Sequence, residues 1–97
     1  MENSIKIQKE ELKQVFFTLI NKIDNLNEDE IYFQKDLYWN INDEELYNVY
    51  EEPKNITIGS IKEDWDFLQK ILTSDREIIN YDFNKIANIL RLIGEKI

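Results

Sequence analysis

Three stretches of the chain repeat apolar residues at the spacing of an amphipathic helix. The first covers about residues 9–26, where the apolar positions are separated by intervals of 4, 3, 4 and 3. The second covers about residues 61–72 and follows Ser60, which has Glu63 three positions later, the pattern of a capping box. The third opens at Asp82 and carries an apolar stripe that begins at Phe83. Trp65 lies on the second stripe, so we expect it in the core.

Shorter stretches have the alternation of β-strands. Residues 31–41 place apolar side chains at odd positions on both sides of the charged pair Lys35–Asp36, which predicts one strand with Trp39 in the core and Tyr32 and Tyr38 on the solvent side. A hairpin tip or bulge at Lys35–Asp36 is the alternative. Residues 55–58 and 77–79 are candidates for a second and a third strand. Between the first two, Asn42 is placed to cap a short helix that Pro53 must end.

These elements predict an α+β fold that is mainly helical, with three amphipathic helices packed on a small antiparallel sheet, either a hairpin or a meander. No repeat, linker or low-complexity tract interrupts the chain, so we expect one compact domain over residues 1–97. Residues 1–7 are short, and the Ile5–Ile7 stretch fits either a frayed end or a brief edge strand.

Negative charge is concentrated in residues 28–52. This segment has nine acidic residues and one lysine, which gives it the same net charge, −8, as the whole chain. It also contains four of the five tyrosines and one of the two tryptophans. Such a charge favours a basic protein as the partner and disfavours nucleic acid and anionic membranes.

Several kinds of chemistry lack the residues that they need. The chain has no cysteine and no histidine, so the usual ligands of zinc, copper and haem iron are missing, as are Ser–His and Cys–His catalytic pairs. Among many carboxylates some pair always has the spacing of a hydrolase, so such a pair indicates little. We therefore expect no enzyme activity, no metal and no cofactor. The sequence shows no membrane span or signal peptide, from which we expect a cytoplasmic location.

Tyrosines and carboxylates of the acidic segment are the candidate contacts with a partner. Tyrosine combines a large contact area with a polar tip and is frequent at interface hot spots. The competing interpretation is that the carboxylates only form a solvated face at a helix start. The candidate residues are Tyr32, Tyr38, Asp43, Glu44, Glu45, Tyr47, Glu51 and Glu52.

Small size, acidity and the missing catalytic groups favour a non-enzymatic protein-binding module. Its most concrete form is an immunity or antitoxin-like protein that neutralises a basic toxin or nuclease. A first alternative is a DNA mimic that inhibits a nucleic-acid-binding protein, which requires two rows of carboxylates spaced like phosphates. A second is a structural homodimer without ligand, in which another subunit covers the solvent side of the sheet, where Tyr32 and Tyr38 are expected.

Overall fold

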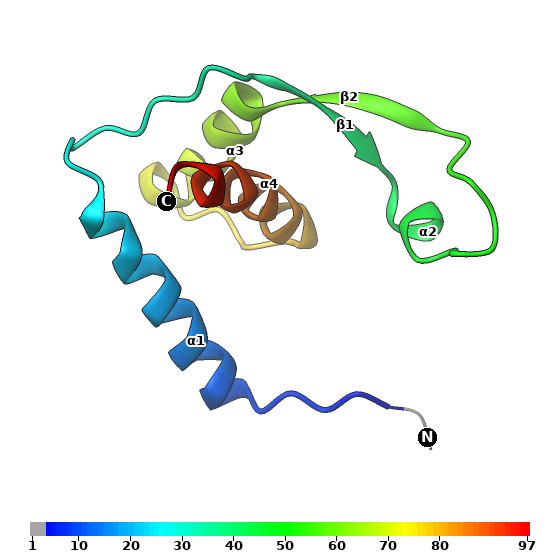
Figure 1. The fold of residues 1–97 in the computed structure, drawn as a ribbon, viewed down its shortest axis with the longest axis horizontal. Coiled ribbons are helices and arrows are strands. Elements are labelled where there is room, and N and C mark those ends of the chain that lie inside the picture. Colours follow the sequence, from blue (N-terminus) through cyan, green and yellow to red (C-terminus); the bar gives the residue numbers. More distant parts are fainter. Residues whose placement is uncertain (1–3) are drawn as a thin grey trace. The chain divides into compact units, whose positions relative to one another are not determined.

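The computed structural model describes residues 4–97, which fall into two units. The first unit extends to Tyr32 and contains a helix and a short 3-10 turn. The second unit, residues 33–96, contains a two-stranded antiparallel sheet and three helices. The single compact domain expected over residues 1–97 stays a prediction. In chain order the elements are α1 (Lys9–Asn21), η1 (Lys22–Asn25), β1 (Leu37–Ile41), α2 (Asp43–Leu46), β2 (Ile56–Ser60), α3 (Ile61–Thr73) and α4 (Asn80–Lys96) (Figure 1).

The α+β class is confirmed, with 54% of the described residues helical. The helix expected over about residues 9–26 is present as α1 followed by η1, where the tighter 3-10 turn ends the helix and the Leu26 N–H donates to the Ile23 carbonyl at 3.0 Å. Residues 4–8 form no strand, so the brief edge strand is not observed. The rest of that stretch, residues 1–3, lies outside the described residues.

The first strand is shorter than expected because its partner changes into a helix. β1 pairs with β2 from Ile41↔Ile56 to Leu37↔Ser60. The next residue, Ile61, already belongs to α3, and its N–H donates to the Asp36 carbonyl at 2.8 Å. Residues 31–36 therefore have no strand to pair with, and the expected strand over 31–41 is correct only in its second half.

The two faces of the sheet are the reverse of those expected. Tyr38 is half-buried, and its hydroxyl donates to Asp64 of α3 at 2.6 Å. Trp39 on the other face is 72% exposed. The expectation of Trp39 in the core and Tyr38 in solvent is therefore wrong. The physical reason is the buried carboxylate of Asp64: the Tyr38 hydroxyl donates to it, so this hydrogen bond, and not the apolar alternation along the strand, decides which face of β1 the helices cover.

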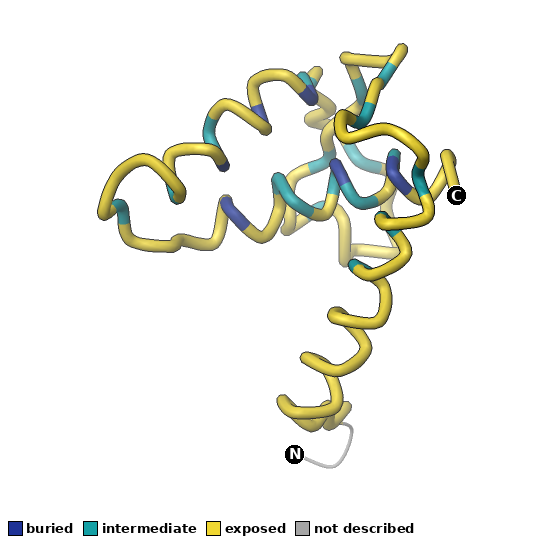
Figure 2. The backbone as a smooth tube through the Cα atoms, turned by 90° about the vertical axis from the view of Figure 1, so that its left-hand side faces the viewer, coloured by how far each residue is buried: buried dark blue, intermediate teal, exposed yellow. Residues whose placement is uncertain are grey.

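The core of the second unit lies between α3 and α4. Its buried apolar side chains are Ile61, Leu68, Ile89 and Ile93, and Figure 2 shows the buried positions along these two helices. The buried face of each helix is rotated away from the expected apolar stripe, because it includes Asp64 in α3 and Asp82 in α4. Phe83 is consequently 69% exposed, and Trp65, expected in the core, is 44% exposed.

The third expected strand is absent, since the described residues form one sheet of two strands. Residues 77–79 instead belong to a connection held by Arg76, whose guanidinium donates to both Asp82 oxygens, at 2.9 and 2.6 Å, and to the Phe67 carbonyl at 3.2 Å. This clamp ties α3 to the start of α4. None of the helices that residues 4–97 form is long and apolar enough to cross a membrane.

Candidate protein-binding site

The connection between the two strands brings together most of the predicted contact residues. We call residues 42–55 the acidic loop; it contains α2 and has five carboxylates against one lysine, Lys54. As predicted, Asn42 caps α2, with its side-chain oxygen accepting the Glu45 N–H at 3.0 Å. The cap fixes where the loop leaves β1, so the loop starts from a defined position.

Glu45 braces the loop from inside. Its carboxylate accepts the backbone N–H groups of Lys54 and Asn55, at 3.2 and 3.1 Å, and the Asn55 side-chain amide at 3.4 Å. The capping-box pattern predicts that this side chain returns to the Asn42 N–H; it instead crosses to the other end of the loop. Glu45 is half-buried, and its hydrogen bonds join the start of the loop to its end.

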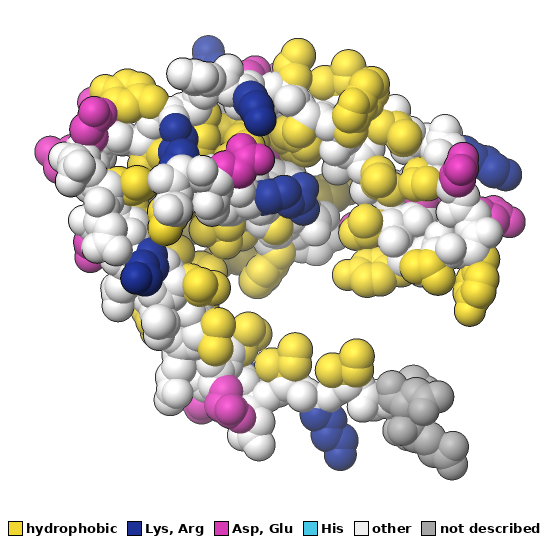
Figure 3. Space-filling view, viewed as in Figure 1, with side chains coloured by type: hydrophobic (Ala, Val, Ile, Leu, Met, Phe, Trp, Pro, Cys, Tyr) yellow, Lys and Arg dark blue, Asp and Glu magenta, His cyan; other side chains and the backbone are white. Residues whose placement is uncertain are grey.

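Outside the brace, the loop presents aromatic, apolar and acidic side chains to solvent. Tyr47 is 81% exposed, Val49 83% and Tyr50 94%. Apolar and tyrosine side chains gather around α2 in Figure 3, beside carboxylates. The exposed carboxylates of the loop are Asp43, Glu44, Glu51 and Glu52.

Two predicted contact residues lie elsewhere. Tyr32 is 62% exposed but belongs to the first unit, together with Glu28, Asp29 and Glu30. The acidic segment is thus divided between the units, and only its second part lies in the acidic loop. Tyr38 is turned toward the helices, which removes its hydroxyl from the outer surface.

Val49 and Tyr50 are additional exposed residues that the sequence analysis left out of the site. The spacing of Leu46, Val49 and Tyr50 is typical of one packed face of a short helix, but α2 ends at Leu46. The signal that could have found them is the position of Tyr50 directly before Glu51 and Glu52, since two consecutive acidic residues seldom enter a core and keep their neighbours near the surface.

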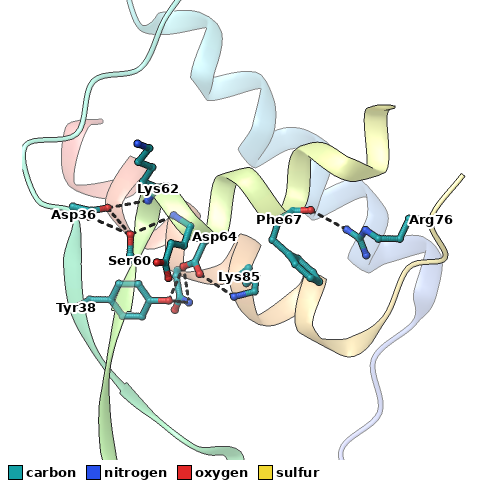
Figure 4. A network of polar contacts seen from close by, with 10 residues as sticks. Asp36, Tyr38, Ser60, Lys62, Asp64, Phe67, Arg76 and Lys85 are labelled. Atoms are coloured by element: carbon teal, nitrogen blue, oxygen red, sulfur yellow. Dashed lines mark hydrogen bonds and ion pairs between the residues drawn. The ribbon is translucent and has the colours of Figure 1, made fainter. Parts of the chain in front are cut away.

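A second polar cluster, also missed, joins the sheet to the helices. Asp64 is 3% exposed; its carboxylate accepts from the Tyr38 hydroxyl and from Lys85 Nζ at 3.1 Å (Figure 4). Asn88 donates to the Tyr38 oxygen at 2.7 Å and to Asp64 at 3.4 Å. Burial, together with the hydrogen bond to Asp64, raises the pKa of Tyr38 well above its ordinary value, so the phenol stays neutral and donates. The cluster connects β1, α3 and α4.

Other carboxylates support helix starts. Asp36 accepts from the Lys62 N–H at 2.9 Å and from the Ser60 hydroxyl at 3.0 Å, and these bonds lower the pKa of Asp36. The Arg76 guanidinium, with the Ile79 N–H, lowers the pKa of Asp82. Both carboxylates are ionised and held by the fold, which leaves them unsuited to contact a partner.

Metal binding finds no support in the geometry of residues 4–97, where no three acidic side chains lie close enough together to hold an ion. What the acidic loop offers is an anionic surface with aromatic side chains, held in shape by Glu45. No protein-family description, curated protein or solved structure matches the chain.

Proposed function

We propose that this protein is a non-enzymatic acidic module that binds a basic protein through its acidic loop. One observation carries the proposal: Tyr47, Val49 and Tyr50 are more than 80% exposed, on a loop that also has four exposed carboxylates. A small fold that keeps such side chains in water loses the free energy that their burial would give. A partner that covers them recovers it.

The two kinds of side chain have different roles in this proposal. Tyr47 and Tyr50 supply contact area with a hydroxyl at its edge, which is typical of residues that anchor an interface. The exposed carboxylates attract a basic surface at long range and raise the association rate. The Glu45 brace reduces the conformational entropy that the loop loses on binding, because the loop is already ordered.

The most concrete form is an immunity or antitoxin-like protein that neutralises a basic toxin or nuclease in the cytoplasm. Enzymes that act on nucleic acid bind a polyanion through basic surfaces, so an acidic protein that docks there blocks the substrate. The DNA-mimic alternative requires two rows of exposed carboxylates. In the acidic loop the carboxylates come as two short runs, 43–45 and 51–52, and the side chain of Glu45 is turned inward. This favours a complementary patch over a phosphate track.

Affinity capture from native lysate tests the proposal with matched baits. One bait is Glu51→Gln/Glu52→Gln; the control is Asp66→Asn/Asp75→Asn, which removes the same charge from exposed positions outside the loop. We expect a basic protein to be retained by the wild type and the control, with retention by the loop variant reduced about tenfold at low salt. Equal retention by both variants would contradict the assigned surface.

Tyr47 is tested by kinetics on the captured partner. Tyr47→Ala removes an anchor and should speed dissociation about tenfold, with the association rate nearly unchanged. The acid variants should instead slow association and reduce its salt dependence. If Tyr47→Ala leaves the dissociation rate unchanged, the tyrosine is not an anchor.

A further inference from the structure

The hairpin carries a second exposed surface, distinct from the acidic loop. In the antiparallel register Trp39 is opposite Ile58, and Ile41 is opposite Ile56. Directly opposite residues share a face of the sheet, and alternate residues along a strand share it too. We call the set formed by Leu37, Trp39, Ile41, Ile56 and Ile58 the apolar face.

The other face of the hairpin fixes the direction in which the apolar face points. Tyr38 lies opposite Gly59, and its ring covers this glycine so closely that a Cβ there would overlap the ring. Its hydroxyl is bonded to Asp64 of α3. The apolar face therefore points away from α3 and α4. A second subunit on the Tyr38 side, as expected from the sequence, would meet the unit's own helices instead.

The apolar face is large for a surface left in water. Trp39 is 72% exposed, Leu37 65%, Ile58 63% and Ile56 46%. These fractions correspond to on the order of 500 Å² of apolar surface, at the upper end of what monomeric proteins expose in one patch. In residues 33–96 the buried apolar side chains all come from α3 and α4. The hairpin thus adds no fully buried apolar side chain to that core; within the apolar face only Ile41 is half-buried.

We propose that a second copy of the chain covers the apolar face, with the same faces of two hairpins packed across a two-fold axis. None of the five side chains is charged, so a basic partner would find no carboxylate opposite its cations there. A second copy offers an uncharged face of the same size. Two such faces bury about 1,000 Å² in total, the area at which specific interfaces begin. The acidic loop continues from the Ile41–Ile56 end of the strands and contributes no residue to the apolar face.

Sedimentation equilibrium of the full chain between about 1 and 200 µM tests this proposal, because association of copies depends on concentration. We expect the mass to double as the concentration rises, more readily in high salt, which screens the repulsion between acidic copies. Ile58→Lys should abolish the doubling. Asn40→Lys is the matched control: it places the same charge on the opposite face of β1, at an exposed position, and should leave the doubling intact.

Tryptophan fluorescence gives a readout that needs no interface variant. In a Trp65→Phe background Trp39 is the sole tryptophan, and its emission should shift to shorter wavelength as the dimer forms. A chain that stays monomeric up to about 200 µM with solvent-exposed Trp39 would overturn the proposal. So would doubling that Ile58→Lys leaves unchanged. Trp39 emission shielded at every concentration, and exposed by Phe16→Lys in α1, would show that the apolar stripe of α1 covers the face and would also overturn it.

Discussion

The buried carboxylates of α3 and α4, Asp64 and Asp82, and the exposed carboxylates of the acidic loop are chemically alike but differ in what surrounds them. Asp64 and Asp82 are 3% and 4% exposed, and each is bonded to a cation from another part of the second unit. Asp43, Glu44, Glu51 and Glu52 are exposed, and within residues 4–97 none of their side chains forms an ion pair. Asp64 and Asp82 join elements of the fold, whereas the four acidic side chains of the loop lie in water.

The comparison shows that local density of charge is a poor guide to the role of an acidic residue. Asp64 and Asp82 lie outside the acidic segment of the sequence, yet within residues 4–97 they are the two carboxylates that the fold buries. Within that segment, Asp36 and Glu45 are also held by backbone N–H groups. Only carboxylates that the fold does not use are suited to meet a partner.

The largest effect that separates the two regions is expected at Asp64. Asp64→Ala leaves Lys85 and the Tyr38 hydroxyl without their acceptor, at a cost of about 3 kcal/mol in the free energy of unfolding. Asp66→Ala, an exposed position on the same helix, should change it by less than about 0.5 kcal/mol. Urea unfolding followed by circular dichroism measures both. Similar losses in the two variants would remove the distinction between the regions.

Tyr38 gives a smaller effect with a characteristic pH dependence. Tyr38→Phe should cost about 1 kcal/mol, since Asp64 loses its shortest hydrogen bond. The pKa of Tyr38 is raised in the folded state, so the contribution of its neutral phenol is fully present below the unfolded pKa of about 10. It is lost as the pH rises through the folded value. The difference in unfolding free energy between wild type and Tyr38→Phe should therefore shrink above about pH 10.

A matched control for this change is Tyr47→Phe, which removes a hydroxyl from an 81% exposed side chain. It should leave stability within about 0.5 kcal/mol of the wild type. A difference between wild type and Tyr38→Phe that stays constant through alkaline pH would show that the phenol is not protected by the fold.

The sequence predicts the elements of this fold better than their orientation. The start of α1 and the boundaries of α3 follow from apolar spacing and from the Ser60 cap, whose oxygen accepts the Glu63 N–H at 3.3 Å as predicted. These signals are local, so they need no knowledge of the rest of the chain. The length of β1 depends instead on where its partner strand ends, which is a contact between residues distant in sequence.

Burial was mispredicted where a polar residue occupies the core. Apolar periodicity places Trp65 inside and passes over Asp64, because a carboxylate is counted as polar whatever binds it. Its partners Tyr38, Lys85 and Asn88 come from two other elements, and a single sequence does not show that they converge. The same cluster holds Tyr38 against the helices, so Trp39, the next residue on β1, lies on the solvent side of the sheet. The candidate site was predictable as a segment, but the inward role of Glu45 depends on the path of the loop.

Within the acidic loop itself, Glu45 is expected to behave unlike its neighbour Glu44. Glu45→Gln weakens the acceptor for the Lys54 and Asn55 N–H groups, and we expect a loss of about 1 kcal/mol in local stability. Glu44→Gln removes the same charge from an exposed side chain and should have no such effect. Hydrogen exchange at the two amides, measured by NMR, should be about fivefold faster in Glu45→Gln only. Equal exchange in both variants would show that Glu45 does not brace the loop.

The smallest effect on the fold is expected from the exposed acids of the loop, and it is the one that tests their availability. Asp43→Asn, Glu44→Gln, Glu51→Gln and Glu52→Gln together remove four negative charges without removing an ion pair found within residues 4–97. The free energy of unfolding should stay within about 0.5 kcal/mol of the wild type, or rise slightly at low salt as repulsion between the acids is relieved. Urea unfolding at two salt concentrations measures this. A loss above about 1 kcal/mol would mean that these carboxylates support the fold, and the contrast with the buried carboxylates of Asp64 and Asp82 would no longer hold.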